Sequence, residues 1–351
     1  MRDSVNIRIT GTGSALPGRI VTNQELEQLV ETSDTWIRER TGIGERHVSV
    51  GETVVTLASE AADKALKQAG KTAEEIDLIL VATCSPEQYL PCCACQVQAA
   101  VGAVNALAFD VNAACSGFLF ALNTVDAYLR MGLAKNALVI GSEVLSKLVD
   151  WTDRSSCILF GDGAGAVVVE RCETEHKTVA KENRTTKAAA GILGRSLHSD
   201  GAGGGVLRCG AGRPETPFAR FATAGAEKNG ASDSRDHFIR MDGQEVYRFA
   251  TRQVPICIEE ALADAGLNVT DIDLFVLHQA NARIIDAVAK RLRVDREKFP
   301  TNLERVGNLS SASIPVLLDE LHGQGKLHRG DRIVLAGFGA GLTIGACVMI
   351  W

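Results

Sequence analysis

The two halves of this 351-residue chain repeat the same residues at a constant spacing of 196 (261 − 65 = 196). Seven residues of the first half recur in the second: Ala65, Leu66, Ala69, Gly70, Ile76, Asp77 and Leu78 return as Ala261, Leu262, Ala265, Gly266, Ile272, Asp273 and Leu274. Gly141 and Gly337 keep the same spacing. A repeat this long is typical of a duplicated domain, because solenoid repeats are only about 20 to 50 residues long. The sequence therefore predicts two halves with similar folds.

Each copy of the repeat predicts an Ala-rich helix followed by a short strand. The helix ends at an Ala-Gly pair, and glycine after the last periodic residue is a helix stop signal. The strands are expected over 77–82 and 273–278, where an Asp leads a continuous apolar run. Such runs suit strands that are covered on both faces. The predicted fold class is therefore α/β.

The composition fits a large α/β enzyme with two cores. The chain has 351 residues, of which 46% are hydrophobic and 23% are charged. A chain of this length and composition is sufficient for two domain-sized halves, each with its own core. The net charge of −6 and the pI near 5.7 argue against a general nucleic-acid binder. Residues 1–4 lead into an alternating segment over 5–10 that is typical of a strand and not of a signal peptide. Because no apolar run is long enough to cross a bilayer, we expect no membrane insertion and a cytoplasmic location.

The first half is expected to cover residues 1–171 and the second half residues 172–351. The polar, charge-rich segment 172–190 is predicted to connect them, and a strand is expected to begin near Gly191. A second loop, rich in Gly, Ser and Asp, is predicted over 200–236. Neither segment has the low complexity of a disordered domain, so both are expected to be surface loops.

Cys115 lies where a predicted strand gives way to a predicted helix. Residues 110–117 read Asp-Val-Asn-Ala-Ala-Cys-Ser-Gly and continue into an apolar run, and the small residues leave the sulfur open to a substrate. A thiol in the first turn of a helix faces free backbone N–H groups and the positive end of the helix dipole, so we expect a stabilised thiolate. The plainer interpretation is a buried structural cysteine, which is what most free cysteines are.

The other nine cysteines are interpreted as small hydrophobic residues. Cys92, Cys93 and Cys95 contain one C-x-x-C spacing, but no second pair and no nearby His would complete four zinc ligands. A disulfide framework is not expected in a long chain without export signals. The sequence therefore predicts no metal site.

Two further segments carry residue types that catalytic sites use. An apolar strand ends in His-Gln-Ala-Asn at His278, and a Gly-Asn turn at Asn308 leads into a helix start rich in small residues. Taken alone, His278 could be a hydrogen-bonded core residue and Asn308 an ordinary turn residue. The spacing of the repeat, however, carries Cys115 onto Ser311, close to Asn308. We therefore expect the nucleophile and the Asn at corresponding strand-to-helix junctions, where a duplicated fold would gather a site between its halves.

The setting of the glycine-rich segments disfavours a nicotinamide or nucleotide enzyme. A dinucleotide fingerprint must follow a strand and open a helix. The segment 337–341 lies between two apolar runs and predicts strand-turn-strand, and Gly11-Thr12-Gly13 lacks the third glycine. Glycine-rich turns do let backbone N–H groups approach a ligand closely.

Together, the segments around Cys115, His278 and Asn308 resemble the Cys-His-Asn site of the β-ketoacyl-ACP synthase III family, the condensing enzymes that start fatty-acid synthesis. The resemblance covers nearly the whole chain. It implies the thiolase-like fold, in which two similar halves stack in five layers, α-β-α-β-α. It also implies a homodimer whose sheets continue across the two-fold axis, and neither a cofactor nor a metal.

The same resemblance implies a role for each site residue. Cys115 would attack the thioester of an acyl-CoA primer and release CoA, and malonyl-ACP would then bind. His278 and Asn308 would hold the malonyl thioester oxygen while CO₂ leaves, and the resulting carbanion would attack the acyl-cysteine to give 3-oxoacyl-ACP. The backbone N–H groups of Cys115 and Ala340 would hold the oxyanion. Many family members have glycine in place of Ala340, and because a backbone group donates, we expect little effect unless the turn needs a positive φ.

Further matches to the family concern CoA. The segment that begins at Thr32 resembles the part that meets CoA, with Trp36 stacking on adenine, Arg154 on the other side of the base and Arg40 near the phosphates. Without the resemblance, Trp36 would equally suit an anchor on a helix face. Asn281 matches a residue that supports the catalytic Asn and His.

The resemblance also implies a basic patch for the acidic acyl carrier protein. Its residues are Arg248, Arg283, Lys290 and Arg291. Without the match, these cations would be read as a solvated helix face. Leu90 would reach from the partner subunit to the floor of the acyl pocket. Tyr89, Pro91 and the cysteines after them depart from the commonest patterns, so acetyl, longer straight and branched primers all stay open. The first candidate among them is acetyl-CoA.

Other functions use the same constellation. A sibling enzyme could use it for acyl transfer without elongation, for quinolone-type condensation or for priming in secondary metabolism. A non-catalytic partner subunit is disfavoured because Cys115, His278 and Asn308 are all present. Asn308 also disfavours the type with two active-site histidines, and the absence of a Cys beside 337–341 disfavours thiolases proper.

Overall fold

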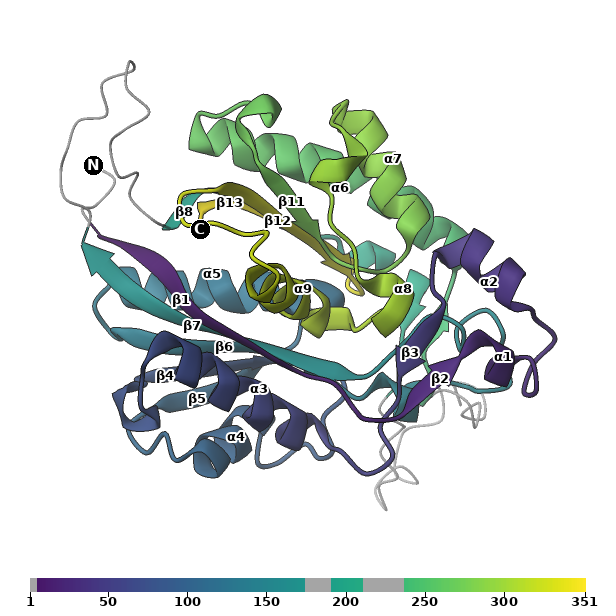
Figure 1. Cartoon of the computed structure of the whole chain (residues 1–351), viewed down its shortest axis with the longest axis horizontal. Coiled ribbons are helices and arrows are strands. Elements are labelled where there is room, and N and C mark those ends of the chain that lie inside the picture. Colours follow the sequence, from purple (N-terminus) through teal and green to yellow (C-terminus); the bar gives the residue numbers. More distant parts are fainter. Residues whose placement is uncertain (1–4, 174–190, 211–236) are drawn as a thin grey trace, which may run out of the picture.

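Two β-sheets lie face to face with helices between them (Figure 1). The computed structural model describes residues 5–173, 191–210 and 237–351. The first sheet has the order β1-β7-β6-β4-β5, with β1 (Val5–Ala15), β4 (Leu78–Ala82), β5 (Leu107–Val111), β6 (Asn136–Glu143) and β7 (Gly163–Glu173). The second has the order β11-β12-β13-β8, with β8 (Gly191–Ser199), β11 (Leu274–Leu277), β12 (Arg332–Gly339) and β13 (Thr343–Ile350).

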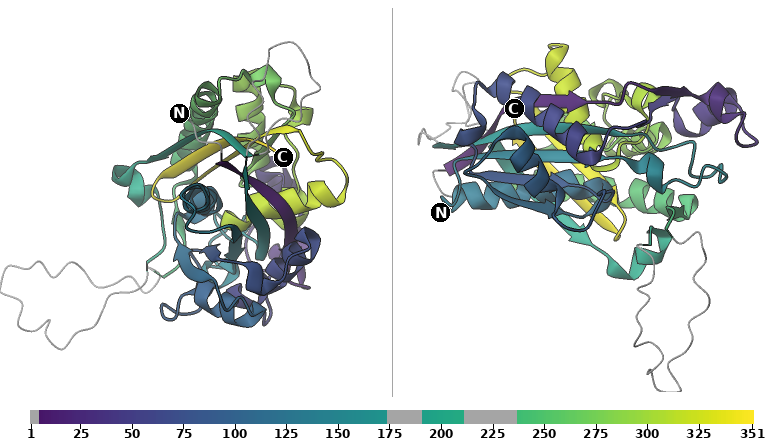
Figure 2. Two further views of the ribbon diagram at one scale, coloured as in Figure 1. Left: turned by 90° about the vertical axis from the view of Figure 1, so that its left-hand side faces the viewer. Right: turned by 90° about the horizontal axis from the view of Figure 1, so that it is seen from below.

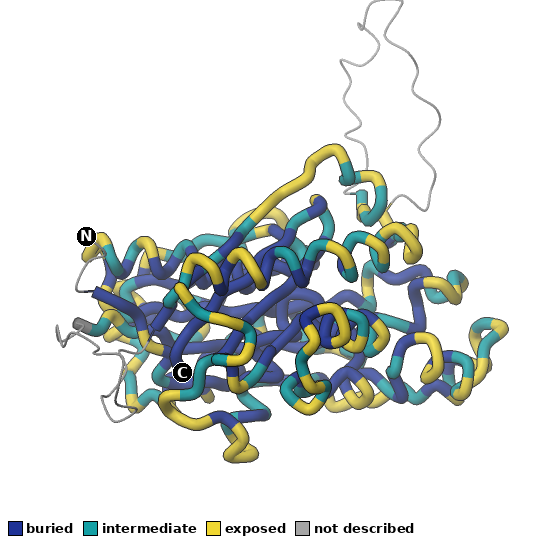
Figure 3. Tube along the Cα trace, turned by 90° about the horizontal axis from the view of Figure 1, so that it is seen from above, coloured by how far each residue is buried: buried dark blue, intermediate teal, exposed yellow. Residues whose placement is uncertain are grey.

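Helices fill the space between the sheets and cover both outer faces (Figures 1 and 2). The long helices are α3 (Val54–Ala69), α4 (Cys93–Val101), α5 (Gly117–Arg130), α6 (Gly243–Ala265), α7 (Ala282–Leu292) and α9 (Ser313–Gly323). Helices α5 and α9 share one hydrophobic core with strands of both sheets, α3 and α4 cover the first sheet, and α6 and α7 cover the second. The layers are therefore α-β-α-β-α, as expected. Figure 3 shows the deepest burial along the central strands and helices.

The second sheet repeats the strand order of the first. β8-β13-β12-β11 has the same succession of antiparallel, antiparallel and parallel pairs as β1-β7-β6-β4. Both predicted helix stops are present, because Gly70 ends α3 with a φ of +66° and Gly266 ends α6 with a φ of +67°. Left-handed backbone strains residues that carry a Cβ, which is why glycine ends both helices. The repeat in the sequence is thus also a repeat in the fold.

Shorter elements complete the described part of the chain. They are the strands β2 (Ile20–Thr22), β3 (Glu45–His47), β9 (Leu207–Arg208) and β10 (Arg240–Met241) and the helices α1 (Asn23–Leu26), α2 (Asp34–Thr41) and α8 (Leu303–Val306). The 3-10 turns are η1 (Ala73–Glu75), η2 (Ala114–Ser116), η3 (Leu145–Leu148), η4 (Gly201–Val206), η6 (Val269–Asp271), η7 (Arg296–Lys298) and η8 (Ser310–Ala312). Within the described ranges, no helix has both the length and the apolar character needed to cross a membrane.

Several strands extend beyond their predicted bounds because their residues continue to find ladder partners. β1 continues to Ala15, which pairs with β7, and β7 itself continues to Glu173, past the predicted boundary at residue 171. β12 continues through Gly339, so the predicted turn at 337–341 is shorter and lies between β12 and β13. Part of the predicted loop 200–236 forms η4 and β9. Residues 174–190 and 211–236 of the two predicted loops lie outside the described residues.

Candidate active site

Cys115 lies in η2, between the end of β5 and the start of α5, at the junction predicted from the sequence. The end of β12 lies directly against this turn. A Cβ on Gly339 would fall 2.6 Å from the Cys115 nitrogen, so only glycine permits this approach. The Ser116 hydroxyl lies 2.8 Å from Thr343 Oγ1 and joins the turn to β13. Residues from the end of the second half therefore enclose the nucleophile of the first.

The second half contributes an equivalent turn on the other side of the site. η8 lies 196 residues beyond η2 (310 − 114 = 196), and Ser310 has a φ of +48° where Ala114 has +46°. The two turns contact each other at the starts of α5 and α9. The site therefore lies between the halves, at corresponding junctions, as the repeat predicted.

His278 follows directly after β11 and lines the same cavity as Cys115. Its backbone N–H donates to the Ala336 carbonyl (2.8 Å), and its ring meets the Phe338 ring edge-on at a centroid distance of 5.4 Å. Burial lowers the pKa of His278 to about 3, so the imidazole is neutral at physiological pH. Nδ1 is buried without a hydrogen-bond partner, so Nε2 is the nitrogen that can serve a substrate.

Asn308 has its side-chain amide oriented by the turn that follows it. The Ser310 backbone N–H donates to Asn308 Oδ1 (2.9 Å). The Asn308 backbone pairs with Leu159 (2.9 Å) and Gly161 (3.0 Å) of the first half. Since Oδ1 is engaged, the amide NH₂ is the group left to donate to a ligand.

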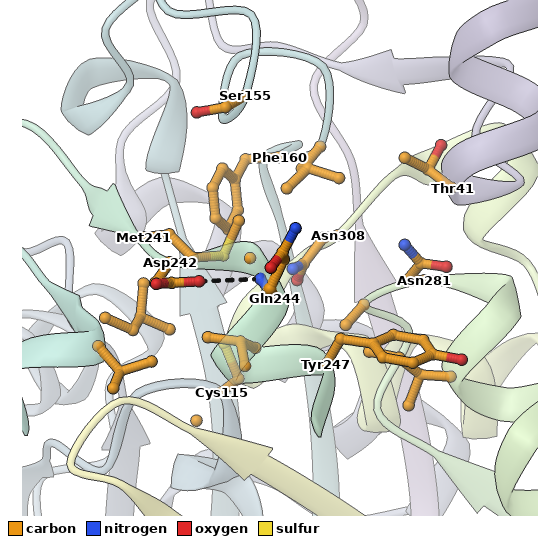
Figure 4. Close-up of a pocket in the computed structure, with 18 of the residues that line it drawn as sticks. Thr41, Cys115, Ser155, Phe160, Met241, Asp242, Gln244, Tyr247, Asn281 and Asn308 are labelled. Carbon is orange, nitrogen blue, oxygen red and sulfur yellow. Dashed lines mark hydrogen bonds between the residues drawn. The ribbon is translucent and has the colours of Figure 1, made fainter. Parts of the chain in front are cut away.

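Cys115, His278 and Asn308 line one cavity of about 1400 Å³. Phe338 and Gly339 of β12 line the same cavity. Figure 4 shows Cys115 and Asn308 in this pocket together with residues from the start of α6, such as Gln244 and Tyr247. The sequence did not single out the residues around the start of α6 that line this pocket, since nothing local marks them as part of a site.

Ala340, the second proposed oxyanion donor, follows Gly339 at the turn. Its φ is not positive, since the non-glycine residues with positive φ in the described ranges are Ala114, Arg293 and Ser310. The turn therefore accepts alanine without strain, in line with the expectation for a backbone donor.

The expected stabilised thiolate is wrong for the free protein. Burial raises the pKa of the Cys115 thiol to about 12, and the charge of Glu143 raises this pKa further. The Ser310 hydroxyl and the Cys115 N–H act in the lowering direction, but burial outweighs them. Glu143, at the end of β6, and Ser310 are site residues that the sequence reasoning missed. The signal available in the sequence was Glu143 itself, a charged residue at the end of an otherwise apolar strand.

The proposed CoA residues gather around Trp36. Trp36 and Arg40 line the cavity, and the guanidinium carbons of Arg154 and Arg40 lie 5.2 and 5.8 Å from the Trp36 ring centre. A base between Trp36 and Arg154 needs about 7 Å, two layers of roughly 3.5 Å each. Arg154, which donates to the Glu31 carbonyl (3.0 Å), would therefore have to move outward to admit adenine. Thr32 does not line the cavity, and its hydroxyl is buried without a partner.

Asn281 lines the cavity but has other partners than the resemblance implied. Its Oδ1 caps α7 by accepting from the Arg283 N–H (2.9 Å), and its Nδ2 donates to the Arg40 carbonyl (3.0 Å). Within the described residues it makes no hydrogen bond to His278 or Asn308. Asn281 thus ties α7 to α2, which carries Trp36 and Arg40.

The four basic residues of the expected patch divide into two pairs. Arg248 of α6 and Arg283 of α7 line the cavity, where Arg248 pairs with Glu245 and Arg283 lies 5.9 Å from the Tyr247 ring centre. Lys290 and Arg291 are exposed in the last turn of α7 and do not line the cavity. From Arg283 to Lys290 the helix rises about 10 Å, so the second pair lies well away from the opening.

Leu90 and the cysteine cluster lie together, away from the cavity. Leu90 is 85% exposed in the single chain and does not line the cavity. Cys92 is the N-cap of α4, and Cys93 and Cys95 lie in its first turn. No cluster of His, Cys, Asp and Glu side chains that could hold a metal ion occurs in the described part of the chain.

Comparisons with known proteins agree over the full length. Residues 109–188 and 262–351 match the family models for 3-oxoacyl-[acyl-carrier-protein] synthase III and for its C-terminal part. The chain is 45% identical to the β-ketoacyl-[acyl-carrier-protein] synthase III of Clostridium acetobutylicum, over 99% of each protein. It superposes on the Aquifex aeolicus 3-oxoacyl-[acyl-carrier-protein] synthase III with a TM-score of 0.85, at 40% identity and covering 98% of this chain and all of the other. The priming β-ketosynthase of the R1128 polyketide pathway gives a TM-score of 0.84 at 32% identity, covering 98% of this chain and 96% of the other.

Proposed function

This chain belongs to the β-ketoacyl-ACP synthase III family, and from that premise we propose that it condenses an acyl-CoA primer with malonyl-ACP to give 3-oxoacyl-ACP, CoA and CO₂. The chain is thus an acyltransferase with the thiolase-like fold. The observation that carries the proposal is that Cys115, His278 and Asn308, from both halves of the chain, line one cavity. Acetyl-CoA is the first candidate primer.

In the first step the Cys115 sulfur attacks the thioester carbon of the primer. The sulfur lies at the start of α5, and the backbone N–H groups of Cys115 and Ala340 would stabilise the tetrahedral oxyanion. The close approach of Gly339 to the Cys115 backbone supports this role, because Ala340 follows Gly339 directly in the chain. CoA leaves and the acyl group remains on sulfur.

In the second step His278 and Asn308 would hold the malonyl thioester oxygen. A neutral imidazole and an amide NH₂ both donate, and neither requires a proton transfer to stabilise the enolate that forms as CO₂ leaves. The low pKa of His278 suits this role, since the ring stays neutral. The carbanion then attacks the acyl-cysteine and releases the thiolate.

The proposal extends to substrates and partners outside the reacting atoms. Trp36, Arg40 and Arg154 would bind CoA, and Arg248 and Arg283, with Lys290 and Arg291 farther along α7, would receive the carrier protein. Two copies of the chain would form a homodimer, in which Leu90 would enter the acyl pocket of the partner subunit. Its exposure in the single chain is consistent with such a contact. We also propose that residues 1–171 and 172–351 are the two duplicated units.

A condensing enzyme of secondary metabolism is the second candidate. The observation in its favour is the match to the polyketide priming β-ketosynthase over 98% of this chain. The two candidates share the chemistry and differ in primer and carrier.

One experiment tests the proposal directly. The purified enzyme is incubated with malonyl-ACP and a panel of acyl-CoAs, and both the products and the acylated protein are weighed by mass spectrometry. Condensation predicts loss of CO₂ and a 3-oxoacyl-ACP with the primer's carbon chain extended. Acyl transfer to Cys115 without CO₂ loss would contradict condensation, and the preferred primer distinguishes the two pathways.

A further inference from the structure

Glu143 is a buried carboxylate that the proposed condensation leaves without a role. It closes β6, has no exposed surface, and forms no ion pair with Lys, Arg or His in the described ranges. Burial of a carboxylate without a cation is costly unless hydrogen-bond donors surround it. The donors around Glu143 therefore show which parts of the chain this carboxylate holds in place.

The donors to this carboxylate come from both halves of the chain. In the first half, the Ser85 hydroxyl (2.6 Å), the Thr83 hydroxyl (3.2 Å) and the Cys84 backbone N–H (3.1 Å) donate to Oε2. In the second half, the hydroxyls of Ser310 (3.0 Å) and Ser311 (2.9 Å) donate to Oε1. The carboxylate thus connects the loop after β4 to η8, across the boundary between the halves.

The backbones of the two halves also meet closely at this point. A Cβ on Gly141 of β6 would fall 2.3 Å from the Ser311 carbonyl oxygen, so β6 and η8 approach each other backbone to backbone. The Ser311 hydroxyl also donates to the Ala82 carbonyl at the end of β4 (2.8 Å). Because no side chain fills this contact, η8 has little freedom to shift against β6 while these hydrogen bonds are intact.

Ser310 connects the carboxylate to Asn308. Its hydroxyl donates to Glu143, and its backbone N–H donates to Asn308 Oδ1 (2.9 Å). Its φ of +48° lies in the left-handed region, which a residue with a Cβ keeps only when its surroundings hold it there. The contact at Oδ1 fixes the orientation of the amide and leaves the NH₂ to donate. The orientation of the Asn308 amide therefore depends on the conformation of Ser310.

We propose that Glu143 is a positioning residue for decarboxylation, which holds Ser310 so that the Asn308 NH₂ is directed at the malonyl thioester oxygen. The inference rests on the proposed function for the identity of that oxygen. It gives the buried charge a role, since an apolar residue at this position could not hold both halves by hydrogen bonds.

Glu143→Gln tests the two half-reactions separately. Only one of the two terminal atoms of glutamine accepts, so one group of donors loses its acceptor. Release of CO₂ from malonyl-ACP by the full-length enzyme should fall at least about tenfold, toward the rate of Asn308→Ala. Acylation of Cys115 by acetyl-CoA in a single turnover should not fall, because burial and the Glu143 charge both raise the pKa of this thiol and the substitution removes that charge. Equal losses in both half-reactions would overturn the proposal, since a role in the fold alone would slow both.

A double-mutant cycle tests whether Glu143 acts through Asn308. In an Asn308→Ala background no amide is left to orient, so Glu143→Gln should slow CO₂ release by less than about a further twofold. A further loss as large as that caused by Glu143→Gln alone would show that the two residues act independently, and would overturn the proposal.

Ser310→Ala and Ser311→Ala form a matched pair. Each removes one buried hydroxyl from Glu143 Oε1, and among the hydrogen bonds of the described residues only Ser310 also bonds the Asn308 side chain. Ser310→Ala should slow CO₂ release about as much as Glu143→Gln does, and Ser311→Ala should slow it clearly less. Equal losses would mean that the hydroxyls hold η8 as a whole, and the link to Asn308 would be wrong.

Hydrogen exchange tests the positioning without any substrate. In Glu143→Gln, the peptide that covers residues 307–312 should exchange its amide hydrogens faster than in the wild type, whereas α6, on the outer face of the second sheet, should exchange at the same rate. Unchanged exchange over 307–312 would overturn the positioning role. If the wild type releases no CO₂ from malonyl-ACP, the proposed function is wrong, and this comparison still decides whether Glu143 holds the turn.

Discussion

Cys115 combines a position at a helix start, in the wall of the cavity, with surroundings that suppress the ionisation of its thiol. The backbone N–H groups at the start of a helix favour a thiolate, but burial and the nearby Glu143 charge raise the pKa of the thiol to about 12. A cysteine at a strand-to-helix junction is thus a candidate nucleophile by position alone. Its reactivity depends on how its proton leaves.

Cys115 is expected to be the only cysteine that carries the primer. After incubation with acyl-CoA, peptide mapping should find the acyl group on Cys115, because it alone lines the cavity among the ten cysteines. Cys115→Ser should abolish condensation, while circular dichroism should be unchanged. An acyl group on Cys92 or Cys95 would refute the assignment.

His278 and Asn308 are expected to act mainly in decarboxylation. His278→Ala or Asn308→Ala should slow release of CO₂ from malonyl-ACP by about 10²–10³, the usual cost of one lost oxyanion donor. Transfer of the acyl group to Cys115 should be affected much less, which single-turnover mass measurements can follow. If acylation falls as far as condensation, His278 activates the thiol and the division of roles is wrong.

Among the secondary-structure elements, β12 lies directly against the turn that carries the nucleophile. Its last residues pass so close to η2 that Gly339 has no room for a side chain, whereas a Cβ on Gly337 would have no neighbour nearer than 3.4 Å. Both glycines lie in the same strand, and they differ in what they approach: the backbone of the nucleophile for Gly339, side chains for Gly337.

Gly339→Ala is expected to impair acylation of Cys115. A Cβ 2.6 Å from a backbone nitrogen must displace either β12 or η2, and displacing either would disturb the proposed oxyanion donors. The acylation rate should fall at least about tenfold, measured by single-turnover acylation with acetyl-CoA. Gly337→Ala is the matched control, and its acylation rate should fall less than that of Gly339→Ala. Equal rates for the two variants would contradict the role assigned to the Gly339 contact.

Across the whole molecule, the negative net charge differs in sign from the arginines that gather at the cavity. The chain carries a net charge of −6, yet Arg40, Arg248 and Arg283 all line the one cavity that holds Cys115. An acidic carrier protein responds to the charges near the opening more than to the sum over the chain. The arrangement depends on α2, α6 and α7 meeting at this end of the fold.

Charge reversal at Arg248 and Arg283 is expected to weaken carrier binding. The double Glu variant should raise KM for malonyl-ACP and reduce its dependence on salt, because exposed attraction is screened over about 10 Å. KM for acyl-CoA should rise less, as Trp36 and Arg154 are untouched. The same reversal at Lys290 and Arg291 measures how far the patch extends along α7. Equal loss for both substrates would mean that these arginines serve CoA or the fold.

The sequence by itself determined the features that depend on local pattern. Apolar periodicity and the conformational freedom of glycine are local properties, so the repeat, the α/β class, the helix stops at Gly70 and Gly266 and the junction at Cys115 could all be predicted. The family could be inferred from the three short segments around Cys115, His278 and Asn308, because the residue types of a catalytic site can be read from the sequence.

The tertiary structure decided the properties that depend on distant residues. The pKa of Cys115 is set by burial, with contributions from Glu143 and from Ser310, which lies 195 residues farther along the chain (310 − 115 = 195). The partners of Asn281 and the closeness of Arg154 to Trp36 likewise come from the packing of separate elements. Electrostatic and desolvation energies depend on the distance between groups in space, and spacing along the chain does not specify that distance.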